Sequence, residues 1–510
     1  MIPPRLLTLT ILSMFAIAAC AGDSGAAAPD NSAVSISYEK ADVPGHQAMG
    51  MMGMGLYQNL TPYLDIGVNS YAAVTGDLGG FITIGVGGRA HYPLGERLSL
   101  GAGLDVGAGG GRGGNTIVGG GLMLRGQLGL DYRLGRLGTV GAGVSRVQFP
   151  DHGIIHSTQP YVAYSYPFEG LYRPGWASDD PIPDASQLRG PGGRHEFSVV
   201  YRRAHVPSGL LNDKNTTPVA QDNFSVLGVE WRSFLSDHAF FDIGSEAAIS
   251  GGSSGYMQIL LGAGLVYPLT SRTIASVVVD AGAGGGGGVQ TGGGGLVRIG
   301  ADLKYLLSPQ LYVDLSAGRL KSISAPFKAS EIGLGVGYQF GPTQKATDES
   351  GAVVTHHLRL RLSEQIYVKA ANNWRTDSVA PQNANKNVDN LGVQVDYFLS
   401  PNWFVTGQGF AAHHGDAGAY MTGLVGAGVR LPLVSNWSAE AEVVTGAAGG
   451  GGLAMGGGWL AQANLGLVYQ FTSRLSGLLT LGEAKAVHGQ FRAHVIGLGL
   501  AYHERLFERR

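Results

Sequence analysis

The feature that most constrains the fold is a strict alternation of apolar residues with polar or small ones. Residues 296–305 show it best, because Val297, Ile299, Ala301, Leu303 and Tyr305 alternate with Arg298, Gly300, Asp302 and Lys304. Segments 331–340 and 459–471 repeat the pattern. Successive strand residues point to opposite faces, so each segment predicts a strand with one apolar face. A tilted strand of about ten residues is long enough to cross a bilayer.

The chain also repeats itself over a long period. Glycine-rich runs begin near Gly107, Gly282 and Gly446, about 165 to 175 residues apart. Each run follows a strand that ends in Pro-Leu, and each repeat closes with another alternating strand. Because solenoid repeats are only about 20 to 50 residues long, this period indicates fused modules. We expect three repeats, at 34–168, 194–341 and 356–505.

The middle repeat contains eight strand candidates, joined by connections that are either very short or longer. They are 195–203, 223–234, 240–249, 257–269, 273–283, 295–306, 310–319 and 330–340. Very short turns beside aromatic residues alternate with longer polar connections, such as 204–222. Transmembrane β-barrels have short turns at one end and longer loops at the other.

Taken together, these features resemble bacterial outer-membrane β-barrel proteins, although the resemblance singles out no family. It covers nearly all of the chain beyond residue 33 and implies a transmembrane, all-β, antiparallel fold. A soluble β-sandwich or propeller would show the same alternation. Strand length, the two kinds of connection and the N-terminal signal argue against that alternative.

The N-terminus has the pattern of a secretory signal. Arg5 precedes an apolar stretch from residue 6 to 17, followed by Ala18, Ala19 and Cys20. We interpret residues 1–19 as a signal peptide and residues 20–33 as a flexible tether. The "IAAC" ending resembles the lipobox of bacterial lipoproteins, which implies that Cys20 is lipidated and anchors the protein at the cell outer membrane. The alternative is an ordinary signal peptide with an unrelated cysteine.

Three sets of eight strands can close in two ways. The Pro- and Gly-rich connection at 169–193 favours three separate barrels. The inward glycines, such as Gly333, Gly335 and Gly337, favour one large barrel, because they would leave an eight-stranded interior underfilled. We expect a single barrel of about 24 strands rather than three barrels of eight.

Two sets of residues are candidates for a functional site in such a barrel. The lumen candidates are inward charges, namely Asp242, Glu246, Arg298, Asp302, Glu440 and Glu442. The gate candidates lie in the glycine-rich runs, and are Gly109, Gly111, Gly284, Gly286, Gly449 and Gly451. Glycine there permits curvature, a passage for substrate, or close approach of another backbone.

The favoured function is a pore or export conduit, for a polymer such as polysaccharide or polypeptide, or for solutes. Three small barrels would instead suggest a non-conducting surface or scaffold protein that presents loops 204–222 and 370–389. A lipid-modifying barrel enzyme, with His488 and Ser324 in its loops, is a third and less favoured alternative. We expect no catalytic residues, no cofactor and no metal site. The expected partners are outer-membrane lipid and periplasmic export machinery. The net charge of −2 gives no sign of nucleic-acid binding.

Overall fold

The computed structural model describes residues 32–168, 194–340 and 353–509, except for residues 113, 213–218 and 371–385. The signal peptide at 1–19, Cys20 and most of the tether at 20–33 lie outside the described residues, so their roles stay predictions. The connection at 169–193 also lies outside them. Among the described residues, no helix is long and apolar enough to span a membrane.

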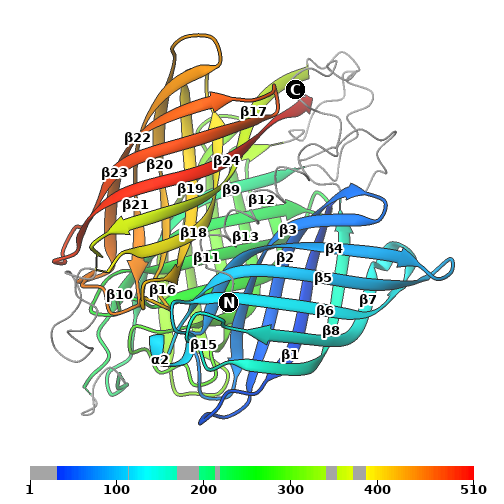
Figure 1. Cartoon of the computed structure of the whole chain (residues 1–510), viewed down its shortest axis with the longest axis vertical. Coiled ribbons are helices and arrows are strands. Elements are labelled where there is room, and N and C mark those ends of the chain that lie inside the picture. Colours follow the sequence, from blue (N-terminus) through cyan, green and yellow to red (C-terminus); the bar gives the residue numbers. More distant parts are fainter. Residues whose placement is uncertain are drawn as a thin grey trace.

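The described chain folds into three closed β-barrels of eight antiparallel strands each (Figure 1). Each barrel closes by pairing its first strand with its last, as in Ser32↔Phe168 and His195↔Phe340. The prediction of one barrel with about 24 strands is therefore wrong, and the alternative of three small barrels is correct.

Barrel 1 consists of strands β1 to β8 and contains two short helical turns. Its strands are β1 (Ser32–Ala41), β2 (Met49–Thr61), β3 (Leu64–Thr75), β4 (Ile82–Pro93), β5 (Leu98–Gly110), β6 (Leu122–Arg133), β7 (Thr139–Gln148) and β8 (His156–Phe168). Helix α2 (Asn115–Val118) follows β5, and the 3₁₀ turn η1 (Gly135–Leu137) follows β6.

Barrel 2 repeats this order without the helical turns. Its strands are β9 (His195–His205), β10 (Phe224–Phe234), β11 (Ala239–Ser250), β12 (Met257–Pro268), β13 (Thr273–Gly285), β14 (Gly295–Leu306), β15 (Leu311–Ser322) and β16 (Lys328–Phe340). All eight strand candidates of the middle repeat are confirmed, with bounds that differ by at most three residues.

Barrel 3 closes with the longest pair of strands, the first and the last. Its strands are β17 (Val353–Val368), β18 (Val388–Phe398), β19 (Trp403–His414), β20 (Met421–Pro432), β21 (Trp437–Gly449), β22 (Trp459–Gln470), β23 (Leu475–Ala486) and β24 (Arg492–Arg509). Strands β17 and β24 pair from Val353↔Arg509 to Val368↔His494.

Side chains fill the interior of each barrel, as expected for a barrel of eight strands. The inward glycines leave room for side chains from neighbouring strands rather than empty space. A methyl group at Gly337 would lie 2.2 Å from the ring of Tyr312, and one at Gly335 would lie 2.3 Å from the Asp314 carboxylate. The space beside these glycines is therefore occupied by side chains of the neighbouring strand.

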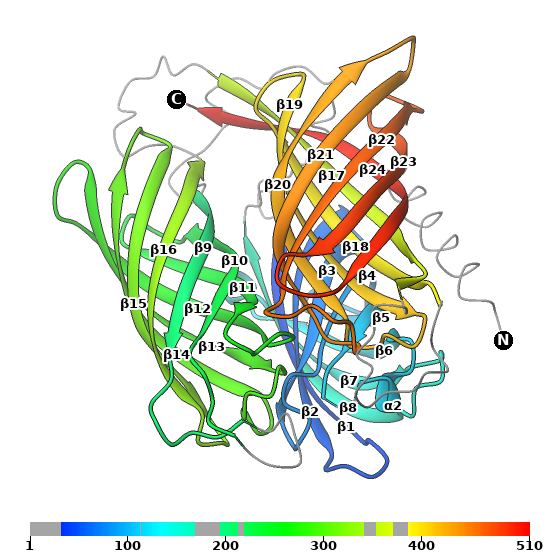
Figure 2. The same ribbon diagram turned by 90° about the vertical axis from the view of Figure 1, so that its left-hand side faces the viewer.

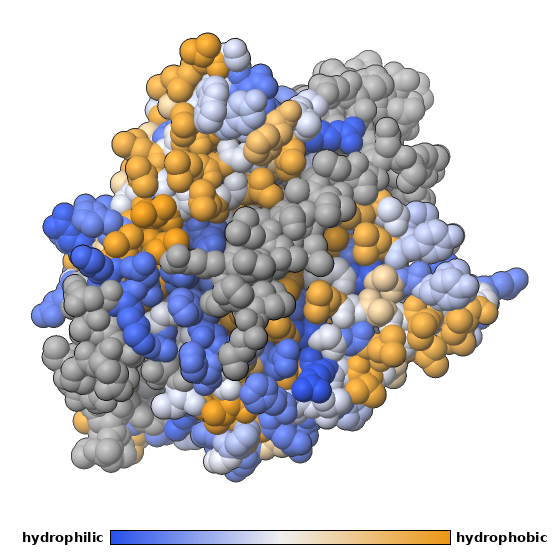
Figure 3. All heavy atoms as spheres, in the orientation of Figure 1, coloured by the Kyte–Doolittle hydropathy of each residue, from blue (hydrophilic) through white to orange (hydrophobic). Residues whose placement is uncertain are grey.

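The outer surface of the barrels is apolar, as the alternation predicts. Leu128, Ile299 and Leu465, one from each barrel, leave 57%, 61% and 69% of their surface exposed. Figure 3 shows hydrophobic side chains gathered over barrel 3 in the upper part of the view and over barrel 1 at the right. A charged interior and an apolar exterior are the arrangement of a transmembrane β-barrel and the reverse of a water-soluble one.

The three barrels pack around a common centre (Figures 1 and 2). In Figure 2, barrel 2 (green) and barrel 3 (yellow to red) stand side by side, and barrel 1 (blue to cyan) lies below barrel 3 and beside the lower part of barrel 2. One apolar cluster contains residues of all three barrels, including Ile82, Ile259 and Met421. The repeats are thus parts of one assembly.

Candidate functional site

The lumen of barrel 2 is closed by a network of buried ion pairs. Arg298 Nε lies 2.6 Å from Asp280 Oδ2, and its Nη1 lies 3.2 Å from Glu246 Oε1. Arg232 Nη2 lies 2.6 Å from Asp302 Oδ2. Asp242, on the strand next to Arg232, is also buried in this interior. The lumen candidates of barrel 2 therefore lie within one charged core.

Barrel 3 has a similar core built from different strands. Arg359 Nη1 lies 2.5 Å from Glu440 Oε1, and its Nε lies 2.7 Å from Asp396 Oδ2. The Nδ2 of Asn464 donates to Glu442 at 2.8 Å. Glu440 and Glu442, the remaining lumen candidates, therefore lie in another barrel from the first four.

Barrel 1 completes the set with residues that sequence reasoning missed. Arg125 Nε lies 2.8 Å from Glu39 Oε1, and its Nη1 lies 3.0 Å from Asp105 Oδ2. The Tyr71 hydroxyl donates to the same Asp105 carboxylate at 2.6 Å. Arg125 is fully buried. Side chains and ion pairs thus fill all three lumens.

The glycine-rich hairpins join the barrels to one another. These hairpins (107–121, 282–294 and 446–458) connect the fifth and sixth strands of each barrel. Each one packs against a receiving loop of another barrel, which connects that barrel's third and fourth strands (76–80, 251–255 and 415–419). We call these three contacts the junctions.

The junctions are equivalent and follow one another around a ring. A methyl group at Gly285 of barrel 2 would lie 2.6 Å from Gly80 N of barrel 1. One at Gly449 of barrel 3 would lie 2.3 Å from Gly255 N of barrel 2. The third contact closes the ring, because a methyl group at Gly110 of barrel 1 would lie 2.9 Å from the backbone nitrogen of Ala419 in barrel 3. Glycine is required here because two backbones touch.

Hydrogen bonds reinforce two of the junctions. Gly79 N donates to Gly292 O at 2.9 Å, between barrels 1 and 2. Between barrels 1 and 3, His414 Nδ1 lies 2.9 Å from Asp151 Oδ2. Partial burial acts to raise the pKa of Asp151, but the hydrogen bonds from His414 and His152 outweigh it, so this pKa lies below its ordinary value.

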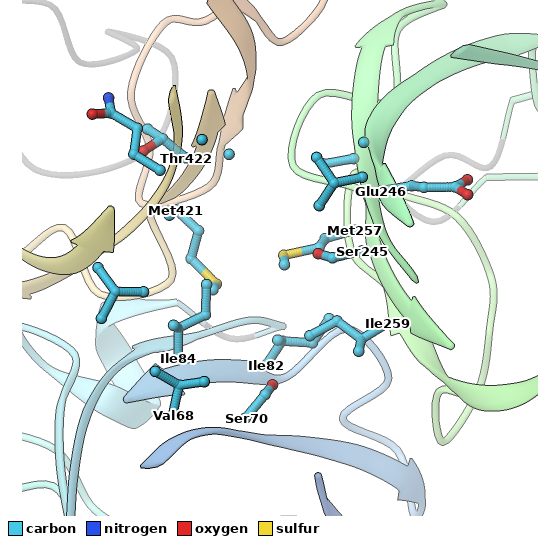
Figure 4. A pocket seen from close by; sticks show the side chains of 18 of the residues that line it. Val68, Ser70, Ile82, Ile84, Ser245, Glu246, Met257, Ile259, Met421 and Thr422 are labelled. Carbon is cyan, nitrogen blue, oxygen red and sulfur yellow. The ribbon is translucent and has the colours of Figure 1, made fainter. Parts of the chain in front are cut away.

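A partly open chamber with a volume of about 2100 Å³ lies between the barrels. Residues of all three barrels line it, and most of the lining surface is apolar. Figure 4 shows Met257, Ile259, Ile82, Ile84 and Met421 around this central space, while Glu246 points away from it into barrel 2. Small-molecule sites usually measure about 300 to 1,000 Å³, so this chamber is unusually large.

The two ends of the chamber differ. Junction glycines line one end, including Gly80, Gly255 and Gly286. Aromatic residues line the other end, where the barrels have their short turns, and they are Phe197, Trp231, Tyr338, Phe340, Tyr397 and Tyr502. The Tyr397 ring lies 5.6 Å from the Phe340 ring, so barrels 2 and 3 meet there. Aromatic residues at this level are typical of a membrane interface.

The gate candidates all lie in the glycine-rich hairpins or at their edges. Gly111, Gly286, Gly449 and Gly451 line the junction end of the chamber. Gly109 and Gly284 lie in strands β5 and β13, just before the hairpins turn. The structure therefore places four of the six gate candidates beside a space that lies between the barrels. The chamber itself was missed, although outward-facing glycines in β19 and β20 were a usable signal.

Within the described part of the chain, no group of three or more His, Cys, Asp and Glu side chains could hold a metal ion. The adjacent residues His413 and His414 point to different surroundings. His413 is buried, with its Nε2 3.5 Å from Glu364 Oε1, whereas His414 faces Asp151 of barrel 1.

No protein-family model matches this chain, and no curated protein does. Among solved structures, the ferric enterobactin receptor of Pseudomonas aeruginosa is 11% identical, with 94% of this chain and 82% of that chain covered and a TM-score of 0.29. A siderophore receptor of Acinetobacter baumannii is 8% identical, with 94% and 81% covered and a TM-score of 0.28. The Yersinia pestis outer membrane protein Ail is 19% identical over 29% of this chain and 99% of its own, with a TM-score of 0.21.

Proposed function

We propose that this chain is a transport-related outer-membrane protein in which three sealed barrels form the walls of a shared apolar chamber. The membrane location is supported by the outer surface. Residues such as Val279, Leu334 and Val443 leave half or more of their side chains exposed, and lipid would cover them. Anchoring through Cys20 remains part of the proposal.

A water-filled conduit through a barrel has little support from the geometry. Arg125, Arg298 and Arg359 each extend into the lumen of their own barrel and pair with at least two carboxylates. A polymer would have to break these buried pairs in order to pass, and removing one partner of such a pair costs about 3 to 5 kcal/mol. The pore function is therefore replaced by one that uses the space between the barrels.

The chamber is the single observation that carries the proposal. Its apolar walls match the apolar part of a lipid or another amphiphile, and the aromatic residues of barrels 2 and 3 at one end match the depth of lipid head groups. Binding such a molecule, or passing it along the chamber, requires no catalysis, so we propose no enzymatic activity.

A scaffold protein made of three small barrels is the second candidate. One observation favours it: the lumens are filled, as they are in small non-conducting barrels. On that alternative, loops 204–222 and 370–389 would bind partners, although residues 213–218 and 371–385 of these loops lie outside the described residues. A scaffold has no need of an accessible chamber.

Reconstitution of the full chain in lipid bilayers tests the proposal. We expect no large steady conductance, together with saturable binding of the apolar fluorescent probe N-phenyl-1-naphthylamine. Ser245 points into the chamber, and Ser245→Trp should weaken probe binding about tenfold, which corresponds to about 1.4 kcal/mol.

The matched control is Ile299→Trp, on the exposed outer face of barrel 2, which should bind the probe as the wild type does. Heat-dependent mobility on a gel would establish that both variants are folded. A steady current that persists in Ser245→Trp would restore the pore function. Equal probe binding by all three proteins would favour the scaffold.

A further inference from the structure

The chamber walls of the three barrels differ at equivalent positions. In barrels 1 and 2, a cross-strand pair facing the chamber consists of serine and isoleucine, Ser70↔Ile84 and Ser245↔Ile259. In barrel 3 the corresponding pair is Gly409↔Gly423. Two residues before these serines, barrels 1 and 2 have valine and isoleucine, whereas barrel 3 has Gly407. We call Gly407, Gly409 and Gly423 the bare wall.

The bare wall borders open space. A methyl group at Gly407 or Gly423 would meet no atom within 4 Å. At Gly409 the nearest atom is Ile84 Cδ1 of barrel 1, at 3.6 Å, which is an ordinary contact. Gly407, Gly409 and Gly423 all line the chamber. The chamber is therefore wider against barrel 3 than against the other two barrels.

Neither of the usual reasons for glycine applies to this wall. Neither Gly407 nor Gly423 has a positive φ, in contrast to the glycines of the hairpins. No backbone approaches them closely, in contrast to the junctions. Because glycine weakens a strand and brings no side chain to pack, its presence at neighbouring positions points to the space itself as the selected feature.

We infer that the bare wall holds an acyl chain of a membrane lipid, laid against strands β19 and β20. This inference rests on the proposed function of the chamber. The flanking residues Val393, Val405 and Val425 are apolar, and water needs two to four polar partners that such a wall does not offer. A linear hydrocarbon chain fits a smooth strip of backbone. The aromatic end of the chamber suits the lipid's polar head group.

Native mass spectrometry of the full chain, purified from membranes and washed with detergent, tests the inference. The wild type should retain a lipid whose mass identifies both its acyl chains and its head group. Gly423→Leu fills the space beside the wall and should lower the retained fraction about tenfold. Gly126→Leu is the matched control, because a methyl group there also meets nothing within 4 Å but the residue lies outside the chamber.

A second measurement needs no variant. A phospholipid with a photoreactive group in its tail should label wild-type peptides within 403–432. Labels restricted to other strands would overturn the inference, as would equal lipid retention by wild type, Gly423→Leu and Gly126→Leu. Binding of N-phenyl-1-naphthylamine without any retained lipid would overturn the acyl-chain assignment and leave the proposed function standing. Absence of both probe and lipid would overturn both.

Discussion

The inside of each barrel and the space between the barrels are opposites. Inside barrel 1, Arg125 is fully buried and pairs with Glu39 and Asp105. Between the barrels, the walls are mainly Val, Ile, Leu, Met and Gly around about 2100 Å³. A conventional porin has its free volume inside the barrel, in a polar, water-filled channel.

The difference between the barrel interiors and the space between the barrels shows where the free volume of this fold lies. A narrow barrel has room for side chains only, and these reach each other across the lumen as ion pairs. Larger space arises where convex barrel walls meet, and those walls are apolar like the rest of the outer surface. A barrel protein can therefore form an apolar site without enlarging any barrel.

The largest expected effect comes from removing a buried charge inside one of the barrels. Arg125→Met leaves Glu39 and Asp105 buried without their cation, which should lower the free energy of unfolding by about 3 to 5 kcal/mol. Urea unfolding in detergent micelles measures the change. Arg146→Met is the matched control on an exposed site of the same barrel, and it should stay within about 0.5 kcal/mol. Similar losses in both variants would contradict a lumen held closed by ion pairs.

The next effect comes from the junctions that form one end of the chamber. In Gly449→Ala, the new methyl group would lie 2.3 Å from Gly255 N, and backbone cannot rotate away as a side chain can. We expect a loss of about 1 to 3 kcal/mol and a wider distance between spin labels on barrels 2 and 3. Gly95→Ala, in a turn with nothing within 4 Å, should change neither quantity. An unchanged distance in Gly449→Ala would mean that the junction does not hold the barrels together.

A smaller effect is expected from the ion pair between barrels 1 and 3. Asp151→Asn removes the charge that accepts from His414, at a cost of about 1 to 3 kcal/mol for a charged hydrogen bond. Because the pKa of Asp151 is lowered in the folded protein, its carboxylate contributes fully above the ordinary value of 3.8 while His414 is protonated, and this contribution is lost as the pH falls through the lowered pKa. The melting points of wild type and variant should differ at pH 7 and converge below pH 3.8. A constant difference across this range would exclude Asp151 as its source.

The smallest effect has the opposite sign. Ala419 has φ of 79°, in the region that favours glycine, and the equivalent residues Gly80 and Gly255 are glycines with φ of 93° and 88°. Ala419→Gly should therefore stabilise the third junction by about 0.5 to 1 kcal/mol, seen as a higher melting point. The reverse change, Gly255→Ala, should destabilise. A lower melting point for Ala419→Gly would indicate that its methyl group contributes packing that outweighs the strain.

Much of the fold could be predicted because its signal is local. Alternation determines which side of a strand is apolar, and the middle-repeat strands were confirmed nearly to the residue. The number of barrels could not be predicted in this way. The inward glycines suggested an empty interior, whereas Tyr312 lies over Gly337 and fills it. Whether an inward glycine lies beside empty space or beneath a neighbouring side chain depends on the residue opposite it, and that residue is determined by how the strands pair.

The chamber could not be predicted from the alternation of apolar and polar residues. An outward apolar residue has the same sequence pattern whether it is exposed on the outer surface, as Ile299 is, or faces another barrel, as Ile84 does. The close approach of backbones at the glycine-rich hairpins was considered as one reason for their composition. The partner in that contact follows from the tertiary arrangement alone, since Gly110 meets Ala419 across more than half of the sequence.

The ring of junctions has a consequence for how the protein is assembled and how it could have evolved. Each junction joins two different surfaces, so a head-to-tail series of three closes on itself and leaves no surface for a fourth member. A chain with two repeats would leave one hairpin and one receiving loop unmatched, and could recruit a second chain through them. During synthesis, the contact between the first and last barrels can form only after the final repeat has been made. The ring of junctions can therefore be complete only when all three repeats are present.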